Sequence, residues 1–319
     1  MTFRRLLSTA GPVLGLLLVL GLIALYPEVR LVFFTGGNCK TILVQTAIVA
    51  VGALGMTLII VSGGIDLSVG SMVALGSVVA ARCLNAGWST AGTVAATMIL
   101  GGCVGCLNGG IIAGFRMLPF IVTLGTMGVL RGSAKWISGK QTVPNPENAT
   151  LGRLLDPINP DQLMPLPPGV WASLGLAVLI AVLMRRTVFG RYLFAVGSNE
   201  SAARLSGVRV AWVKLGVYTV AGLLFGFASL LQNARLSLGD PTAASGLELD
   251  IIAAVVIGGA SLNGGTGSVS GSLLGALTMA VLRSGTQQIG WETYVQEIII
   301  GLVIVFAVGL DKWRQSRGT

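Results

Sequence analysis

A single carboxylate and a pair of glycines interrupt a long apolar run in the first quarter of the chain. Residues 56–71 read MTLIIVSGGIDLSVGS, and no other residue of this run is charged. An acidic side chain inside a membrane is costly and marks a functional site or a structural break, while paired glycines allow helical backbone to be interrupted. The pattern therefore predicts a helix break or a gate. Its residues are Gly63, Gly64, Asp66 and Ser68.

Two roles are open for Asp66. An apolar segment resumes directly after it at Leu67, so its carboxylate can cap the start of the next helix, where unpaired N–H groups attract an anion. Alternatively, Asp66 acts directly in the substrate path or in gating. Both roles predict that Asp66→Ala is damaging.

Residues 185–214 are predicted to form a cytoplasmic loop with a second group of polar side chains. Ser198 or Asn199 can cap a short helix there, which Gly207 can end. Glu200 and Arg204 lie one helical turn apart, where opposite charges pair. A helix of about two turns is not stable alone in water. It must therefore dock either on this protein's own membrane end or on another protein, and the spacing leaves both open.

Other chemistry-bearing patterns do not occur in the sequence. There is no His, and the four Cys have neither the spacing nor the partners of a zinc or disulfide framework. No Gly-x-x-x-x-Gly-Lys-Ser/Thr loop is present, because Gly139 and Lys140 are followed by Gln141. No nucleophile and base are paired. We therefore expect no catalytic residue, no metal and no cofactor in this chain.

The elements that position these residues are expected to lie in a membrane. The chain has 319 residues, of which 53% are hydrophobic and only 10% charged, and its mean hydropathy is +0.84. Soluble domains carry roughly 25% charged residues. A polytopic helical bundle buries its apolar surface in lipid and between helices, so residues 1–319 are predicted to form one all-α transmembrane domain.

About ten apolar segments are predicted to cross the membrane, although several are shorter than a full span. If both termini are cytoplasmic, twelve of the 21 Lys and Arg fall inside with only three acids, Asp66, Glu200 and Asp311. The inside then carries the whole formal charge of +9, which indicates orientation and not nucleic-acid binding. The segments run near residues 6–26, 41–61, 67–81, 89–112, 117–135, 170–184, 215–234, 251–262, 268–282 and 294–310.

The largest external feature is predicted to be the proline-rich stretch 138–169. It contains seven prolines and should be irregular rather than helical. Since it lies near the midpoint of the chain, it is either a linker between two five-helix halves or a landing surface for an extracytoplasmic partner.

Two ridges of small residues predict close helix packing. Glycines recur every four residues in each half of the chain, and in lipid such faces let backbones approach. One ridge in each half also suggests an internal repeat of two related five-helix halves. The ridges are Gly101, Gly105 and Gly109 in one helix, and Gly267, Gly271 and Gly275 in another.

Several ordered motifs resemble those of ribose-type carbohydrate ABC-transporter permeases. The strongest is the run 62–71, SGGIDLSVGS, preceded by Gly-Met-Thr at 55–57. The resemblance covers most of the chain and weakens only at the first helix and in the proline-rich loop; branched-chain amino-acid permeases share distant features. The further matching stretches are 120–126, 130–132, 190–192, 197–207, 234–237, 246–250 and 256–267.

The resemblance implies a permease of the bacterial inner membrane that moves a monosaccharide or related small polar solute by alternating access. Its implied partners are cytoplasmic ATP-binding-cassette subunits, a second identical or different permease subunit, a periplasmic sugar-binding protein and membrane lipid. It assigns Asn199, Glu200, Arg204 and Gly207 to the family's ATPase-coupling loop. Thr123, Thr126 and Asn233 are candidates for the sugar path, because hydroxyl and amide groups match sugar hydroxyls; bridging between helices is their alternative role.

A secondary carrier or channel driven by an ion gradient is the main alternative. It needs coupling residues such as chains of intramembrane acids or His. The sequence has no His, and Asp66 alone gives little support to a proton relay. A membrane-embedded enzyme would need a metal-ligand or nucleophile pattern that we do not find.

Overall fold

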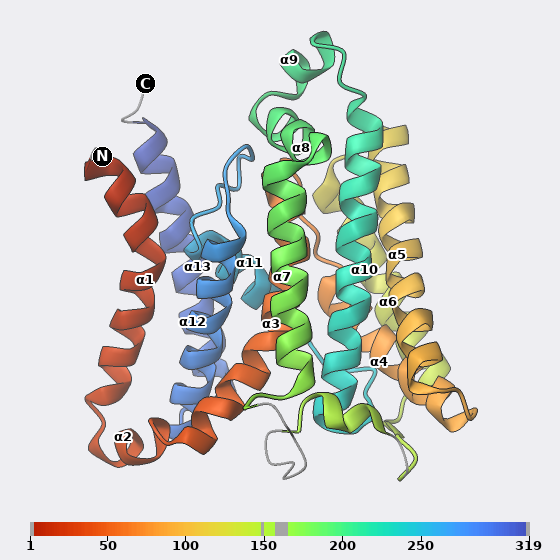
Figure 1. Ribbon diagram of the computed structural model, residues 1–319, viewed down its shortest axis with the longest axis vertical. Helices are drawn as coiled ribbons and strands as arrows, with labels where there is room; N and C mark the ends of the chain where they lie inside the picture. Colours follow the sequence, from red (N-terminus) through yellow and green to blue (C-terminus); the bar gives the residue numbers. More distant parts are fainter. Residues whose placement is uncertain (1–2, 148–149, 157–164, 317–319) are drawn as a thin grey trace.

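The computed structural model describes residues 3–147, 150–156 and 165–316 of the chain. Within these residues it contains thirteen α-helices, one 3-10 helix and a two-stranded antiparallel sheet (Figure 1). The predicted all-α class is confirmed. The elements are α1 (Phe3–Ala24), α2 (Pro27–Phe33), α3 (Gly36–Val61), α4 (Val69–Asn85), α5 (Thr90–Gly114), α6 (Pro119–Ser138), β1 (Val143–Pro144), η1 (Thr150–Leu154), α7 (Pro168–Arg186), α8 (Val188–Ser198), α9 (Glu200–Leu205), α10 (Val210–Leu236), β2 (Leu238–Gly239), α11 (Leu247–Ile257), α12 (Val269–Gln288) and α13 (Thr293–Ser316).

Local sequence sets where many of the helices begin. Five helices start at a side chain that accepts a hydrogen bond from the backbone N–H three residues on, and α2, α6 and α7 start at a proline, which lacks an N–H that would be unpaired there. Each of the ten predicted segments coincides with an α-helix, whereas α2, α8 and α9 lie outside them. The capping residues are Thr35, Ser89, Thr187, Asn199 and Ser268.

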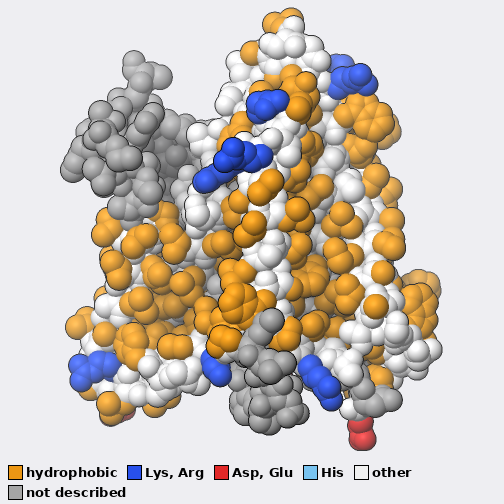
Figure 2. Space-filling model, viewed as in Figure 1, with side chains coloured by type: hydrophobic (Ala, Val, Ile, Leu, Met, Phe, Trp, Pro, Cys, Tyr) orange, Lys and Arg blue, Asp and Glu red, His pale blue; other side chains and the backbone are white. Residues whose placement is uncertain are grey.

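The chain is a multi-pass membrane protein. In the described part of the chain, α3, α5, α7 and α10 are each long and apolar enough to cross a membrane, and α1 with α2, bent by 120°, counts as a fifth candidate. Figure 2 shows hydrophobic side chains over the middle of the molecule and Lys and Arg toward its two ends, as expected for a belt in lipid. The ten predicted crossings exceed the spans identified by length and composition and stay a prediction.

Helix α3 lies at the centre of the bundle. All residues from Ala47 to Val61 are buried, and the helix packs against α7, α10, α11 and α12. The start of α1, the end of α13 and the pair α8 and α9 all lie at one end of the molecule (Figure 1). The start of α1, the end of α13 and the segment 185–214 are therefore on the same side, and their cytoplasmic location stays a prediction.

The first glycine ridge packs α5 directly onto α10. A Cβ at Gly101 would collide with the carbonyl of Gly222, and one at Gly105 with the carbonyl of Tyr218. The predicted close approach is confirmed here. The second ridge is shorter than predicted, because Gly267 lies in the loop before α12 with φ +159°. Two glycines of α12, Gly271 and Gly275, pack on the backbone of α11.

The proline-rich stretch lies between α6, which ends at Ser138, and α7, which begins at Pro168. Its described part holds β1, paired with β2, and the short helix η1. Apart from its ends in α6 and α7, the described part of the stretch is irregular except for these two short elements; Pro157 and Pro160 lie outside the described residues. Its role as a linker or a landing surface stays a prediction, as do the two related halves.

Candidate functional site

The predicted break after α3 is built from a left-handed glycine and a buried turn. Gly63 has φ +83°, a conformation that favours glycine, and the N–H of Gly64 donates back to the carbonyl of Ile59 at 2.9 Å. The next helix starts only at Val69. The backbone from Gly63 to Ser68 is therefore not helical. Gly63 is exposed, whereas Gly64, Asp66 and Ser68 are buried, so side chains must satisfy buried backbone groups of this segment.

Asp66 stabilises this non-helical segment by hydrogen bonds from Ser68. Its side chain is buried, and Oδ1 accepts hydrogen bonds from the backbone N–H of Ser68 at 2.7 Å and from its hydroxyl at 2.6 Å. The carboxylate thus accepts from the N–H of Ser68, the residue before α4, but no side chain caps the first turn of α4 itself, so the capping role stays a prediction. Its direct role in gating stays a prediction.

A chain of hydrogen bonds connects Asp66 to two neighbouring helices. Asn108 of α5 donates from Nδ2 to the hydroxyl of Ser68 at 3.3 Å. Thr126 of α6 in turn donates from Oγ1 to Oδ1 of Asn108 at 2.7 Å. Every member of the chain is buried or half-buried. The break is therefore tied to α5 and α6, and a relative movement of these helices would pull on it.

Thr123 fixes the same segment from its other side. Its hydroxyl oxygen accepts from the N–H of Leu67 at 3.2 Å and donates within α6 to the carbonyl of Pro119 at 3.0 Å. Thr123 and Thr126, which were candidates for the sugar path, thus bind the break and α5 respectively. This geometry corresponds to their alternative, bridging role, and no described contact places them in an open path.

Replacement of Asp66 by alanine is expected to destabilise the bundle by about 1–3 kcal/mol, because two buried donors of Ser68 lose their acceptor. Heat denaturation of the purified chain in detergent, followed by size-exclusion chromatography, measures the loss. Asp66→Asn keeps an acceptor oxygen, so its midpoint of heat denaturation should fall between those of Asp66→Ala and the unaltered chain. Equal midpoints for Asp66→Ala and the unaltered chain would contradict the described contacts.

Asn233 lies far from this break. It is fully buried in α10, exchanges two amide hydrogen bonds with Asn145 at 2.8 and 3.2 Å, and donates to the carbonyl of Ser77 at 3.0 Å. It therefore joins α4 and α10 to the proline-rich stretch. The three path candidates are not brought together in the structure, and their contact with substrate stays a prediction.

The predicted coupling residues form α9 and its caps. Asn199 accepts from the N–H of Ala202 at 2.9 Å, and Gly207 ends the turn with φ +84°. Glu200 binds two cations, Arg204 at 2.8 Å and Lys214 at 2.7 Å. The hydrogen bond from Lys214 lowers the pKa of Glu200 below its usual range, so its carboxylate stays charged near neutral pH and loses these partners only in acid.

Helix α8, which the sequence did not predict as a separate element, anchors α9 to the bundle through a glycine junction. A Cβ at Gly197 would collide with the carbonyl of Val61 at the end of α3, and it would lie 2.7 Å from the N of Gly265. Gly265 also donates its N–H to Val61 at 2.9 Å. Three backbones therefore meet without side chains between them: the end of α8, the end of α3 at the break, and the loop between α11 and α12.

An exposed apolar surface surrounds α9. Leu205 is 90% exposed and Trp212 67% exposed. A cavity of about 500 Å³ beside them is lined by α8 and the start of α10, including Tyr192 and Trp212. Large apolar side chains beside charged ones at one end of the molecule are typical of a protein interface.

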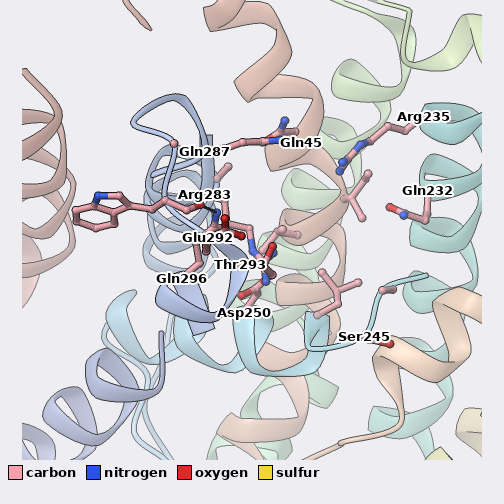
Figure 3. Close-up of a pocket in the computed structure, with 17 residues that line it drawn as sticks. Gln45, Gln232, Arg235, Ser245, Asp250, Arg283, Gln287, Glu292, Thr293 and Gln296 are labelled. Atoms are coloured by element: carbon pink, nitrogen blue, oxygen red, sulfur yellow. Dashed lines mark hydrogen bonds and ion pairs between the residues drawn. The ribbon is translucent and has the colours of Figure 1, made fainter. Parts of the chain in front are cut away.

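A polar cavity of about 510 Å³ lies in the other half of the bundle and was missed by sequence reasoning. Figure 3 shows Gln232 and Arg235 of α10 on one side of it, and Arg283 and Gln287 of α12 across from them. Asp250 of α11 forms an ion pair with Arg283 at 2.7 Å. Its further polar lining residues are Gln45, Ser245, Glu292, Thr293 and Gln296.

The charges of this cavity escaped prediction because the expected spans began at residue 251 and ended at residue 282. The helices extend beyond both limits, so Asp250 and Arg283 lie within α11 and α12. The sequence feature that could have indicated this cavity is the spacing of Arg283 and Gln287, which puts two polar side chains one helical turn apart on the same face. Among the described residues, no group of His, Cys, Asp and Glu could hold a metal ion.

Comparison with known proteins gives consistent matches along the chain. Residues 38–308 match the family model described as "Branched-chain amino acid transport system / permease component". The chain is 41% identical over 304 residues to the ribose import permease protein RbsC of Escherichia coli (94% of each chain), and 36% identical to that of Bacillus subtilis (98% of this chain, 96% of the relative). It is 34% identical to the L-arabinose ABC transporter permease protein AraH of Azospirillum brasilense (98% and 90%). No solved structure matches.

Proposed function

This chain belongs to the family described as branched-chain amino acid transport system / permease component, and on that premise we propose its function. It is the permease subunit of an ATP-binding-cassette importer for a monosaccharide. Its similarity to two ribose permeases and an arabinose permease over nearly its whole length supports this function. The resemblance to ribose-type permeases that the sequence motifs indicated is confirmed by these relatives.

We propose that ATP is hydrolysed by separate cytoplasmic subunits that dock on α9. The chain itself carries no phosphate-binding loop of the Gly-x-x-x-x-Gly-Lys-Ser/Thr type. The observation that carries the docking site is the short helix α9, stabilised by the Glu200 ion pairs and bordered by the exposed side chains of Leu205 and Trp212. A helix of six residues is not stable alone in water, and exposed apolar side chains beside it are typical of a surface that a partner covers.

The remaining partners follow from the same proposal. A second permease subunit, identical or different, would complete the path across the bacterial inner membrane, and a periplasmic sugar-binding protein would deliver the cargo. The proline-rich stretch at the opposite end from α9 is the proposed landing surface. Ten crossings with both termini in the cytoplasm place α9 beside the ATPase and that stretch outside. Movement of α9 would then rock the bundle between outward-open and inward-open states.

Uptake of labelled ribose into liposomes tests this function. The liposomes contain the permease, with or without its ATPase subunits, and the binding protein is supplied on the outside. We expect uptake only when the ATPase subunits and ATP are both present. Uptake of ribose driven by a proton gradient without the ATPase subunits would identify a secondary carrier and refute the proposal.

Charge reversal on α9 tests the docking site separately. Glu200→Lys places a third cation beside Arg204 and Lys214, and the repulsion should displace α9. We expect about tenfold less ATPase subunit to copurify with the permease. Lys40→Glu, an exposed charge reversal in α3 near the opposite end, is the matched control. Exchange of the pair in Glu200→Arg with Arg204→Glu should recover part of the loss, whereas full copurification with Glu200→Lys would remove α9 from the interface.

A further inference from the structure

The ion pair in the polar cavity joins the buried Asp250 to the partly exposed Arg283 and leaves one atom of each partner without a hydrogen bond. Arg283 and Asp250 share a single contact, from a terminal guanidinium nitrogen to Oδ2 at 2.7 Å. The other carboxylate oxygen, Asp250 Oδ1, and the Nε of Arg283 are buried without a hydrogen-bond partner among the described residues. The side chain of Asp250 is only 3% exposed. Both residues line the cavity. The two unpaired atoms themselves have almost no accessible surface, so a ligand reaches them only when the side chains turn toward the cavity, and such unmet groups are costly unless something binds them.

These two atoms present the pattern that two adjacent hydroxyl groups recognise. One hydroxyl can donate to Oδ1 of Asp250, while its neighbour accepts from Nε of Arg283. A bidentate pair between the two side chains would have used both atoms, so the end-on pairing leaves them unpaired. Amide side chains nearby, Gln232 and Gln287, add both donors and acceptors.

The charges around the cavity favour a neutral ligand. Arg283 is compensated by Asp250, and the second guanidinium, that of Arg235, shares the lining with the carboxylate of Glu292. Arg235 makes no ion pair or hydrogen bond within the described part of the chain, so it is free to donate to a ligand oxygen. The volume of about 510 Å³ lies within the range of about 300–1,000 Å³ typical of small-molecule sites.

A neighbouring cavity lies toward the proposed outer surface. A second cavity of about 410 Å³ shares Gln45 and Arg235 with it and is lined by Gly152 and Leu155 of the proline-rich stretch. Both cavities use the end of α10 that is farthest from α9, since α10 starts at Val210 beside it. Arg235 therefore borders both cavities, whereas Asp250 borders only the first.

We infer that Asp250, Arg283 and Arg235 form a binding site for the adjacent hydroxyl groups of a monosaccharide within the permease. This inference rests on the proposed sugar importer and assigns the site at which its cargo is first held. The site would hold sugar weakly after transfer from the binding protein, so that transport can continue.

Thiol protection in the purified full-length permease tests the site without the ATPase. The four native cysteines are replaced by serine, and Gln287→Cys puts a reactive thiol one helical turn from Arg283. Ribose and arabinose are the probes, and glycine betaine at equal osmolarity is the control solute. We expect at least one of the two sugars to slow alkylation at residue 287 and not at an engineered thiol at Ser201, on α9.

Two substitutions locate the effect. Asp250→Asn should raise the sugar concentration for half-protection by about tenfold or more, because a charged acceptor is lost. Arg235→Gln should raise it as well, and it leaves the ion pair intact, so it remains informative if Asp250→Asn fails to fold. Arg82→Gln, outside the cavity, should leave it unchanged.

The outcomes separate this site from the proposed function. Absence of protection by both sugars, or equal protection in Arg235→Gln and the unaltered chain, would overturn the site. If ATP-dependent uptake persists in that case, the importer function stands. If ATP-dependent uptake also fails, the proposed function falls with it.

Discussion

Replacement of Gly197 by alanine is expected to reduce transport by at least about tenfold. The added methyl group would overlap the carbonyl of Val61 and press on the backbone of Gly265. Neither is the flexible end of a side chain, so α8 must move away from the break, and overpacking of this kind costs about 1–3 kcal/mol. Because α8 carries α9, the displacement should weaken the connection between the proposed docking helix and the core. Uptake by the reconstituted importer measures the effect.

The matched control for this change is Gly175→Ala in α7, where an added Cβ meets nothing within 4 Å. It should transport normally. We expect the Gly197 variant to lose uptake but still to copurify with its ATPase subunits, since the ion pairs of Glu200 on α9 are untouched. Normal uptake by Gly197→Ala would show that the glycine junction has no part in transport.

Replacement of Gly105 by valine is expected to prevent recovery of folded permease. In the unaltered chain α5 and α10 touch through backbone, and a Cβ at Gly105 would collide with the carbonyl of Tyr218 and crowd Gly222. Helix association in lipid depends on such close packing, so the two helices would have to separate along their shared face. The break after α3 would lose support as well, because Asn108, which holds Ser68, lies on the same helix.

Size-exclusion chromatography of the detergent extract measures the folded fraction of this variant. Gly128→Val on α6, where nothing lies within 4 Å of an added Cβ, is the control. We expect a monodisperse peak for the control and an aggregated or absent one for Gly105→Val. A monodisperse Gly105 variant with unchanged thermal stability would show that α5 and α10 do not need to be this close.

The local features of the fold were predictable because they depend on residues near one another in sequence. The break at Gly63 and Asp66, the cap at Asn199 and the pairing of Glu200 with Arg204 each involve neighbours within a helical turn or two. Helix positions followed from runs of apolar residues. These are properties that a single stretch of sequence specifies.

Contacts between distant segments were not predictable in this way. Thr123 and Asn233 are polar residues in apolar helices, and the sequence left open whether they face cargo or bridge helices. In the structure Thr123 binds Leu67 in the break before α4, and Asn233 binds Ser77 of α4. The pair of Asp250 and Arg283 joins two helices, and nothing within either helix indicates the other. Asp250 and Arg283 lie just outside the predicted apolar segments, and both line the polar cavity.

The measurement that tests the central claim most directly is the side from which α9 is accessible. A chain without native cysteines, carrying Ser201→Cys, is treated with a membrane-impermeant thiol reagent in intact cells and in inverted membrane vesicles. We predict labelling only in the inverted vesicles, and protection when the ATPase subunits are bound. Labelling of residue 201 from outside intact cells would place α9 away from the ATPase and contradict the account.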